Sequence, residues 1–422
     1  MKLTLPEGLK LGVAMSAAQT EGGALASTWE EWAARGKIRD GSAPGSAGGH
    51  YVRVFEDALL MKQMNVSCCR TGISWARVEP RRGEINFAAL EHYQKELELY
   101  RQYGIEPILT LHHFDEPAWF AQEGGFLSEK GQADFVSFAR RAVRAVMGAC
   151  DTFITINEPN IYAYNGYLYG LWPPGRHSPA AARAALAGMA QCHISSYLAI
   201  HELLPSAKVG MALHMRAFSP LNPCSLWQGR AADTYEKWFQ DSVADAFLLG
   251  RPAFPVPSLN APKGKYYDFV GLNYYTRSII GDFRLSPKNR PVSDLKWDVY
   301  PEGLTALLRA LYAKYQAPVM VAENGVCDNR DAFRSRYIYE HLSALCASLV
   351  PVTHYCHWSL IDNFEWLEGV SARVGLVQVD FDTQARTMKD SAHFFADIIK
   401  NHGVTDEAYL RYVQHQEYPR DK

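Results

Sequence analysis

The chain has 422 residues, of which 48% are hydrophobic and 21% are charged, and its formal net charge is −2. This composition is typical of a globular protein with a large core, and the near-neutral charge excludes the basic surface of a nucleic-acid-binding protein. The first residues contain no apolar signal segment and no apolar run reaches membrane-spanning length, so we expect a soluble, cytoplasmic protein without a membrane partner.

Short apolar runs alternate with longer amphipathic segments along the whole chain. The runs predict eight β-strands, at Lys10–Met15, Val66–Ile73, Ile105–His112, Thr152–Ile156, Lys208–His214, Asp268–Asn273, Pro318–Ala322 and Val352–His357. The segments between them predict helices at Phe55–Met64, Phe87–Tyr103, Gly131–Met147, Ala180–Leu204, Asp233–Leu249, Glu302–Tyr315 and Arg334–Leu349. Continuous hydrophobicity in the strands is typical of a parallel sheet covered on both faces. The alternation therefore predicts one (β/α)8 TIM barrel domain spanning residues 1–422.

The segment after the first strand argues against the main alternative fold. A doubly wound open sheet usually has a glycine-rich phosphate loop at this point, and Gly12–Ala18 is not such a loop. Four loop-like insertions each follow a predicted strand, at Gly36–Gly49, Leu168–Pro179, Leu221–Arg230 and Ile279–Lys296. We expect them at the C-terminal face of the barrel, where this fold builds its active sites.

The eight cysteines are scattered and form no CxxC pair. Several lie inside apolar runs that predict strands. In a long chain without a secretion signal, such cysteines are best interpreted as reduced, buried small hydrophobes.

Polar and aromatic residues gather just after the predicted strands. In chain order they are Gln19 and Glu21; Arg70 and Trp75; His112, His113, Phe114 and Asp115; Asn157 and Glu158; Asn273, Tyr274 and Tyr275; Glu323 and Asn324; and Trp358, Asp362, Asn363, Phe364, Glu365 and Trp366. Because the carboxyl ends of barrel strands meet at one face, these residues predict a single site.

Two glutamates stand out in this set. Glu158 lies in Thr155–Pro159 and Glu323 in Val321–Gly325, each directly after a buried run. Either one alone could cap a helix, but a carboxylate in such a place is costly to desolvate. Two carboxyl groups on separate strands are what the cleavage of a glycosidic bond requires.

A series of motifs extends over almost the whole chain. They are Gly12–Gly22, His50 and Tyr51 with Glu56 and Asp57, Arg70–Trp75, Leu111–Pro117, Asn157–Pro159, Asp268–Thr276, Tyr300–Gly303, Glu323–Gly325 and Trp358–Trp366. Each motif is weak alone, but their order and number are specific. The chain resembles glycoside hydrolase family one, the β-glucosidases and their relatives, which implies a retaining β-glycosidase on a TIM barrel.

The resemblance implies roles for four residues. Glu158 would be the general acid/base and Glu323 the nucleophile, while Arg70 and Tyr275 would contact Glu323 and keep it ionised through charge and hydrogen bonding. Glu158 would hold its proton until the glycosidic bond breaks. A retaining mechanism needs the two carboxyl groups only about 5–5.5 Å apart.

The resemblance also implies a sugar-binding set, made up of Gln19, His113, Asn157, Asn273, Trp358, Glu365 and Trp366. For the two tryptophans, core packing is the alternative interpretation. His112, His113 and Asp115 could suggest a metal, but no metal-binding motif accompanies them. We therefore expect neither a metal nor a cofactor.

Glu365 bears on the class of substrate. Relatives that act on 6-phosphorylated sugars have a small residue at this position, so its carboxylate favours unphosphorylated β-D-glucosides, with β-D-galactosides and β-D-fucosides as related substrates. A 6-phospho-β-glycosidase, a transglycosylating β-glucosidase and a non-catalytic sugar-binding barrel stay as alternatives, and the sequence leaves the oligomeric state open.

Three positions depart from the family pattern. Phe114 stands where many members have tryptophan, Val374 where an aromatic residue is usual, and Asn65 where glycine is common. The first two are expected to reshape the pocket wall. The loop Leu171–Gly175 is expected to border the site of the leaving group.

Overall fold

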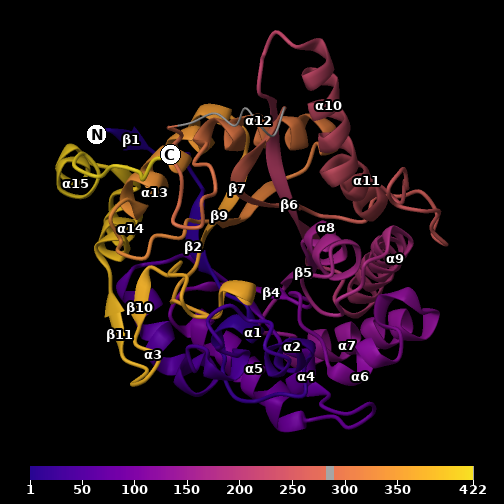
Figure 1. The fold of residues 1–422 in the computed structure, drawn as a ribbon. Coiled ribbons are helices and arrows are strands. Elements are labelled where there is room, and N and C mark those ends of the chain that lie inside the picture. The colour runs from indigo at the N-terminus through magenta and orange to yellow at the C-terminus, as the bar shows by residue number, and fades with distance from the viewer. Residues whose placement is uncertain (282–288, 422) are drawn as a thin grey trace.

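The computed structural model describes residues 1–281 and 289–421. Eight parallel strands close into a barrel in chain order, as the sequence predicts (Figure 1). They are β2 (Lys10–Ala14), β3 (Cys68–Gly72), β4 (Glu106–Thr110), β5 (Thr152–Asn157), β6 (Lys208–Pro220), β7 (Val270–Ile280), β8 (Val319–Asn324) and β9 (Val352–Trp358). Two short antiparallel pairs lie outside the barrel: β1 (Leu3–Thr4) with β12 (Gly403–Val404), and β10 (Val377–Val379) with β11 (Arg386–Met388).

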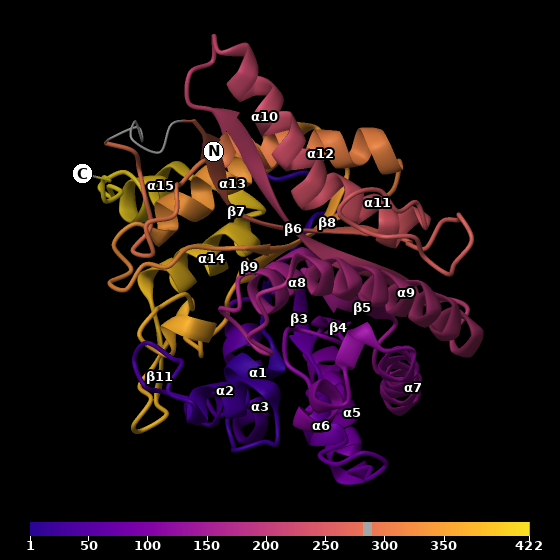
Figure 2. The same cartoon turned by 45° about the vertical axis from the view of Figure 1, so that its right-hand side comes forward.

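Helices surround the barrel (Figure 2). Those at predicted places are α3 (His50–Gln63), α5 (Phe87–Gln102), α7 (Glu129–Val146), α9 (Pro179–Leu203), α12 (Pro301–Tyr315) and α13 (Arg334–Ser348). The others are α1 (Ala17–Thr20), α2 (Thr28–Ala34), α4 (Trp75–Val78), α6 (Ala118–Gln122), α8 (Pro159–Ala163), α10 (Leu226–Glu236), α11 (Ser242–Leu249), α14 (Asp390–Asn401) and α15 (Asp406–Tyr412).

The segment after β6 differs most from the prediction. β6 and β7 continue as a pair to Pro220 and Ile280, beyond the predicted strand ends, and form an arm with α10 (Figures 1 and 2). The loop predicted at Leu221–Arg230 is partly helical, because the side chain of Ser225 caps the start of α10. The helix predicted at Asp233–Leu249 is interrupted by a π-helical turn at Lys237–Asp241. Part of the insertion predicted at Ile279–Lys296 lies outside the described residues.

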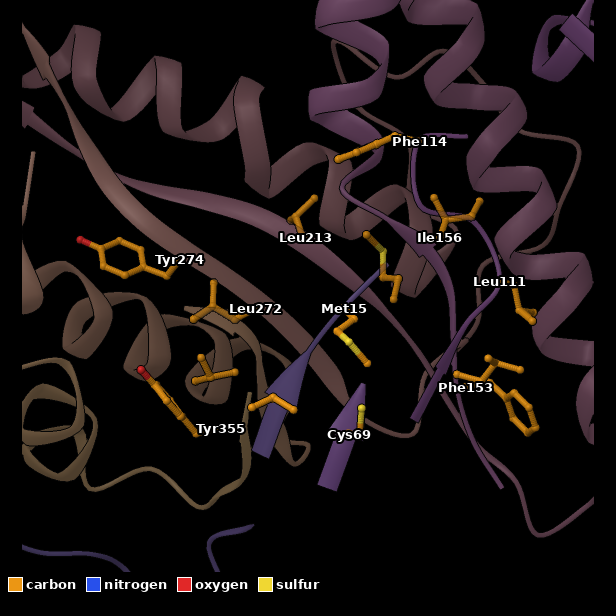
Figure 3. Close-up of a cluster of buried hydrophobic side chains, with 14 of the residues drawn as sticks. Met15, Cys69, Leu111, Phe114, Phe153, Ile156, Leu213, Leu272, Tyr274 and Tyr355 are labelled. Atoms are coloured by element: carbon orange, nitrogen blue, oxygen red, sulfur yellow. The ribbon is translucent and has the colours of Figure 1, made fainter. Parts of the chain in front are cut away.

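Side chains alternate between the two faces of the barrel wall. Phe153, Leu213 and Leu272, labelled in Figure 3, point outward and belong to the large core that includes the helices. The inward-pointing side chains form a second apolar cluster that includes Cys68, Ile108, Ile154, Met320 and Cys356. Two residues further along three of these strands are Arg70, Thr110 and Trp358, so the interior changes from apolar to polar and aromatic toward the C-terminal end.

The strands that lead to Glu158 and Glu323 each carry an extra residue near the C-terminal end. Ile154–Asn157 of β5 advances by three residues where its partner β6 advances by two. Val321–Asn324 of β8 also advances by three residues against two in β9. Such β-bulges re-aim side chains at barrel rims. Glu158 directly follows the first bulge and Glu323 lies within the second, so both glutamates leave the regular alternation of their strands.

All eight cysteines are unpaired in the structure, and their reduced state stays a prediction. Cys224 is exposed, Cys346 is half-buried, and the other cysteines are buried. Among the residues that the structure describes, no helix is both long and apolar enough to cross a bilayer.

Candidate active site

A cavity of about 610 Å³ lies at the C-terminal end of the barrel. Seven of the predicted site residues line it: His113, Glu158, Tyr275, Glu323, Trp358, Glu365 and Trp366. The other four, Gln19, Arg70, Asn157 and Asn273, are fully buried and contact the lining residues from behind. The fold therefore brings all of the predicted residues to one place, in two layers.

Glu323 is held by two residues from neighbouring parts of the barrel. Arg70 donates from Nη1 to its Oε1, and the hydroxyl of Tyr275 donates to its Oε2 at 2.5 Å. Arg70 is itself fully buried and also donates to Thr110 at 3.0 Å and to Asn157 at 2.6 Å. A buried guanidinium with its donors occupied in this way is held in one orientation.

Burial and the partners of Glu323 act on its pKa in opposite directions. Burial raises its pKa to about 7, and the nearby charge of Glu158 adds to this effect, although Arg70 and Tyr275 act in the opposite direction. Burial therefore opposes the effect of these two partners, and the ionised state of Glu323 stays a prediction.

Glu158 has a different environment. Its backbone is left-handed, with φ of 44°, and Pro159 follows as the first residue of α8. Its Oε1 accepts a hydrogen bond from Asn273 at 2.7 Å and lies 3.3 Å from His214 Nδ1. No side chain among the described residues hydrogen-bonds to its Oε2, and Glu158 lines the cavity.

His113 is oriented through Asn157. The side-chain oxygen of Asn157 accepts from Arg70 and Asn273, so its amide nitrogen faces His113 Nε2 at 3.2 Å. That Nε2 must accept, which places the ring proton on Nδ1. Burial, together with the charge of Arg70, holds the pKa of His113 well below its usual value, so the ring is neutral. Its Nδ1 has no hydrogen-bond partner among the described residues.

Two further residues of the site, His214 and Arg216, escaped the sequence analysis. Arg216 donates from Nε to His214 Nε2 at 3.0 Å. Burial lowers the pKa of His214, so its ring is neutral and carries its proton on Nδ1, which donates to Glu158. The position of His214 could have identified it, because this residue ends the fifth predicted strand, Lys208–His214. No site residue was predicted from that strand, whereas each of the other seven predicted strands contributed at least one.

Glu365 follows β9 and lines the same cavity. It accepts hydrogen bonds from Gln19 at 3.2 Å and from the indole of Trp358. Burial raises the pKa of Glu365 to about 8, and the charges of Glu323 and Glu158 contribute to the shift. Burial therefore favours the protonated form of this carboxyl group at neutral pH.

Aromatic rings form one wall of the cavity. His113 is stacked with Trp358 and with Trp366, with ring centroids 5.5 and 6.2 Å apart. Phe114 lies 4.9 Å from Trp172 and 5.4 Å from Trp366. Two of the departures from the family pattern, Phe114 and Val374, therefore line the cavity, and so do Leu171 and Trp172 of the loop at Leu171–Gly175.

The histidines near the site are not arranged for a metal. His112 Nε2 is 3.2 Å from Glu116, among aromatic rings and outside the cavity lining. In residues 1–281 and 289–421, no three His, Cys, Asp or Glu side chains form a group that could hold a metal ion.

The sequence profile of Glycosyl hydrolase family 1 matches residues 1–404. The chain belongs to this family. Beta-glucosidase A of Thermotoga maritima is 28% identical over 446 residues, which cover 95% of this chain and 99% of that protein. The beta-glucosidase from Thermotoga maritima in complex with glucoimidazole has a TM-score of 0.89 and 28% identity, covering 96% of this chain and 100% of that one. The predicted family and the TIM-barrel fold are confirmed.

A plant relative of this chain carries a transferase name. The chloroplastic galactolipid galactosyltransferase of Arabidopsis thaliana is 32% identical over 376 residues, which cover 83% of this chain and 57% of that protein. Family membership therefore leaves both the preferred sugar and the acceptor to be decided.

Proposed function

We propose that this family 1 protein hydrolyses terminal non-reducing β-D-glucosides, and related galactosides and fucosides, with retention of anomeric configuration. The observation that supports this most strongly is that two carboxyl groups line one cavity but have different hydrogen-bond partners. Glu323 is bound by a cation and a phenol, whereas Glu158 has neutral donors on one oxygen and the cavity beside the other. Two such carboxyl groups suit a nucleophile and a proton donor.

In the first step, the Glu323 carboxylate attacks the anomeric carbon while Glu158 gives its proton to the glycosidic oxygen. The bond between that carbon and oxygen breaks, and the alcohol leaves. Arg70 and Tyr275 hold Glu323 in position during the attack. The product of the step is a glycosyl ester on Glu323 and a Glu158 carboxylate.

In the second step, a water molecule takes the place of the alcohol. Glu158 accepts a proton from the water, whose oxygen bonds to the anomeric carbon as the ester bond to Glu323 breaks. Both glutamates return to their starting states, and two displacements at one carbon restore its configuration. The two carboxyl groups and water supply every group that the reaction needs, so no cofactor is required.

The hydrogen bonds of Glu158 suggest which oxygen carries the proton. Asn273 and the neutral ring of His214 both donate to Oε1, so that oxygen has no room for a proton of its own. We assign the transferred proton to Oε2. Asn273 and His214 therefore act as positioning residues for Glu158.

For the sugar itself, we propose contacts with Gln19, His113, Asn157, Asn273, Trp358, Glu365 and Trp366. Two buried atoms in this set, His113 Nδ1 and Asn273 Oδ1, have no partner among the described residues and could hydrogen-bond to hydroxyl groups. The stacked rings supply an apolar face for the sugar. Gln19, Asn157 and Asn273 lie behind the surface, so we expect them to act largely by orienting Glu365, His113 and Glu158.

A panel of aryl β-glycosides tests the proposal. Glucosides should be cleaved fastest, and NMR during the first turnovers should show the β-anomer of the free sugar. Release of the α-anomer would contradict the double displacement. A 2-deoxy-2-fluoro glucoside should leave a sugar attached to the peptide that contains Glu323, detectable by mass spectrometry.

Glu365→Ala tests the sugar end of the cavity. Loss of its hydrogen bonds should lower kcat/KM on an aryl glucoside by about 10–100-fold. Glu98→Gln, an exposed position on α5, serves as the control. An unchanged kcat/KM in Glu365→Ala would remove this residue from the binding set.

Two alternatives can be tested in the same assays. The name of the plant relative favours transglycosylation as a second candidate, and alcohol glycosides formed in the presence of an added alcohol would show it. A 6-phospho-β-glucoside tests the other alternative. Charge repulsion by Glu365 is weak at neutral pH, because burial raises its pKa to about 8, so cleavage of only the phosphorylated substrate would overturn the preference for free sugars.

A further inference from the structure

Arg216 brings to the wall of the cavity a positive charge that has no carboxylate partner among the described residues. It lies on β6, is half-buried and lines the cavity next to Glu158 and His214. Its backbone N–H donates to Gln240 at 2.9 Å, and its guanidinium carbon lies 5.5 Å from the centre of the Phe239 ring. Its Nε donates to His214, but no described residue accepts a hydrogen bond from its two terminal nitrogens.

The other arginines of this region are neutralised. Arg70 is paired with Glu323, and Arg39 is paired with Glu368 at the rim. Beyond β7, Asp298 is paired with Arg277 and Arg290. Lys296 also lines the cavity, but it is exposed and water compensates its charge. Arg216 is therefore the partly buried cation of this wall that has no carboxylate partner among the described residues.

Burial without a counter-charge is costly for a guanidinium. Burial lowers the pKa of Arg216, and the charge of Glu158, the carboxylate nearest in the network, opposes this shift. Arginine nevertheless stays charged in proteins. A fixed cation facing a cavity is a site to which an anionic ligand can bind.

The position of Arg216 falls on the leaving-group side of the proposed reaction. The glycosidic oxygen must lie against Glu158 Oε2, and the sugar lies toward Glu365 and Trp358. The leaving group then extends toward the wall that contains Ile161, Leu171, Trp172 and Arg216. Only the imidazole ring of His214 separates Arg216 from Glu158.

We propose that Arg216 binds a carboxylate on the leaving group, so that preferred substrates are β-glycosides of carboxylated phenols. This inference rests on the proposed function. A single aromatic ring spans about the same distance as the imidazole of His214 between Glu158 and Arg216. The apolar lining of this part of the cavity suits such a ring.

The change in the charge of Glu158 during the reaction would help Arg216 to bind the substrate and to release the product. Before the first step, Glu158 is protonated and neutral, so it offers Arg216 no negative charge, and the carboxylate of the substrate supplies one. After proton transfer, Glu158 is negative again and competes with the carboxylate of the departed phenol. The electrostatics therefore favour binding of the substrate and release of the product.

The test compares two substrates that differ in charge, 4-carboxyphenyl and 4-carbamoylphenyl β-D-glucoside. A substitution of Arg216 that disturbs Glu158 through His214 should lower kcat/KM for both substrates alike. The ratio of the two kcat/KM values therefore reports only the effect of the charge on the leaving group. We expect Arg216→Gln to lower the ratio of carboxylate to amide by at least about tenfold. Arg216→Lys should lower it less, and Arg39→Gln, which removes a paired cation of the same cavity, should leave it near the wild-type value.

An independent measurement on the wild-type protein covers the case in which Arg216 variants do not fold. Here 4-hydroxybenzoate should inhibit cleavage of a neutral substrate more strongly than 4-hydroxybenzamide, and added salt should weaken the difference. Equal inhibition, or an unchanged ratio in Arg216→Gln while both substrates are cleaved, would overturn the inference and leave the proposed function intact. Failure to cleave any aryl β-glucoside would instead overturn the proposed function.

Discussion

Asn273 donates a hydrogen bond of 2.7 Å to Oε1 of Glu158. The same amide nitrogen lies 2.9 Å from the side-chain oxygen of Asn157, which also accepts from Arg70. In the barrel, Asn273 is paired in register with Glu323. One side chain thus links the environments of the two glutamates, and changes to it are expected to affect the pH dependence of the reaction.

Asn273→Asp should move the alkaline limb of kcat/KM to higher pH. A carboxylate in place of the amide repels the ionised form of Glu158, so Glu158 keeps the proton needed for the first step up to a higher pH. Asn273→Ala only removes the hydrogen bond and should cause a smaller shift in the same direction. The measurement is the pH profile on an unactivated glucoside, and a shift to lower pH in the aspartate variant would contradict the contact.

Glu158→Ala should distinguish between leaving groups. On alkyl or disaccharide substrates, loss of acid assistance should lower the rate of the first step by about 10²–10⁴-fold. On a dinitrophenyl glucoside, whose leaving group needs no proton, the first step should change little. Added azide should restore turnover by replacing water, and equal losses on both classes of substrate would refute the role of Glu158 as the acid.

Glu323→Gln should abolish activity on good and poor leaving groups alike, because the amide that replaces the carboxylate cannot form the glycosyl ester. It should also change the pH dependence of stability. The folded-state pKa of Glu323, about 7, lies above the ordinary value of 4.5. The wild-type protein therefore loses stability from this group as pH rises through that interval, and the variant does not.

The free energy of unfolding of Glu323→Gln relative to wild type should consequently rise by about 1–3 kcal/mol between pH 4.5 and pH 8. Urea denaturation at several pH values measures the difference. Glu98→Gln on α5 is the matched control and should show no such trend. A relative stability that falls with pH would mean that Arg70 outweighs the cost of burial.

Tyr275→Phe should move the acid limb of kcat/KM to higher pH. Its hydroxyl donates to Glu323 and thereby lowers the pKa of that carboxyl group, while burial raises it. Removal of one such hydrogen bond is expected to shift the limb by about one pH unit. A limb that stays in place would show that another group sets the acid side of the profile.

Much of the barrel could be predicted because its signals are local. Each strand is a short, continuous apolar run, and seven predicted helices occupy places where the structure has helix. The interrupted helix after β6 was harder, since α10 begins with exposed Leu226 and Trp227 and carries little apolar periodicity. α14 was missed altogether, although Phe394, Phe395 and Ile398 give it a buried face.

Most residues of the site could also be predicted from the sequence, and two were missed. The order of motifs identified Glu158, Glu323 and their partners, because polar groups at strand ends are visible in a linear sequence. His214 and Arg216 were missed because no candidate was taken from the fifth predicted strand, and because the linear sequence does not show that the side chain of Arg216 reaches back to His214.

By itself, the sequence determined the family, the eight-stranded alternation and the presence of a carboxyl group after two of the strands, because apolar runs and strand-end residues are properties of neighbouring positions. Only the tertiary structure decided how those groups face each other and what state they hold. The bulges in β5 and β8 re-aim the two glutamates, and burial sets the pKa of Glu323 against the charge of Arg70. Both effects arise from residues far apart in the chain, since register and desolvation exist only once the barrel has closed.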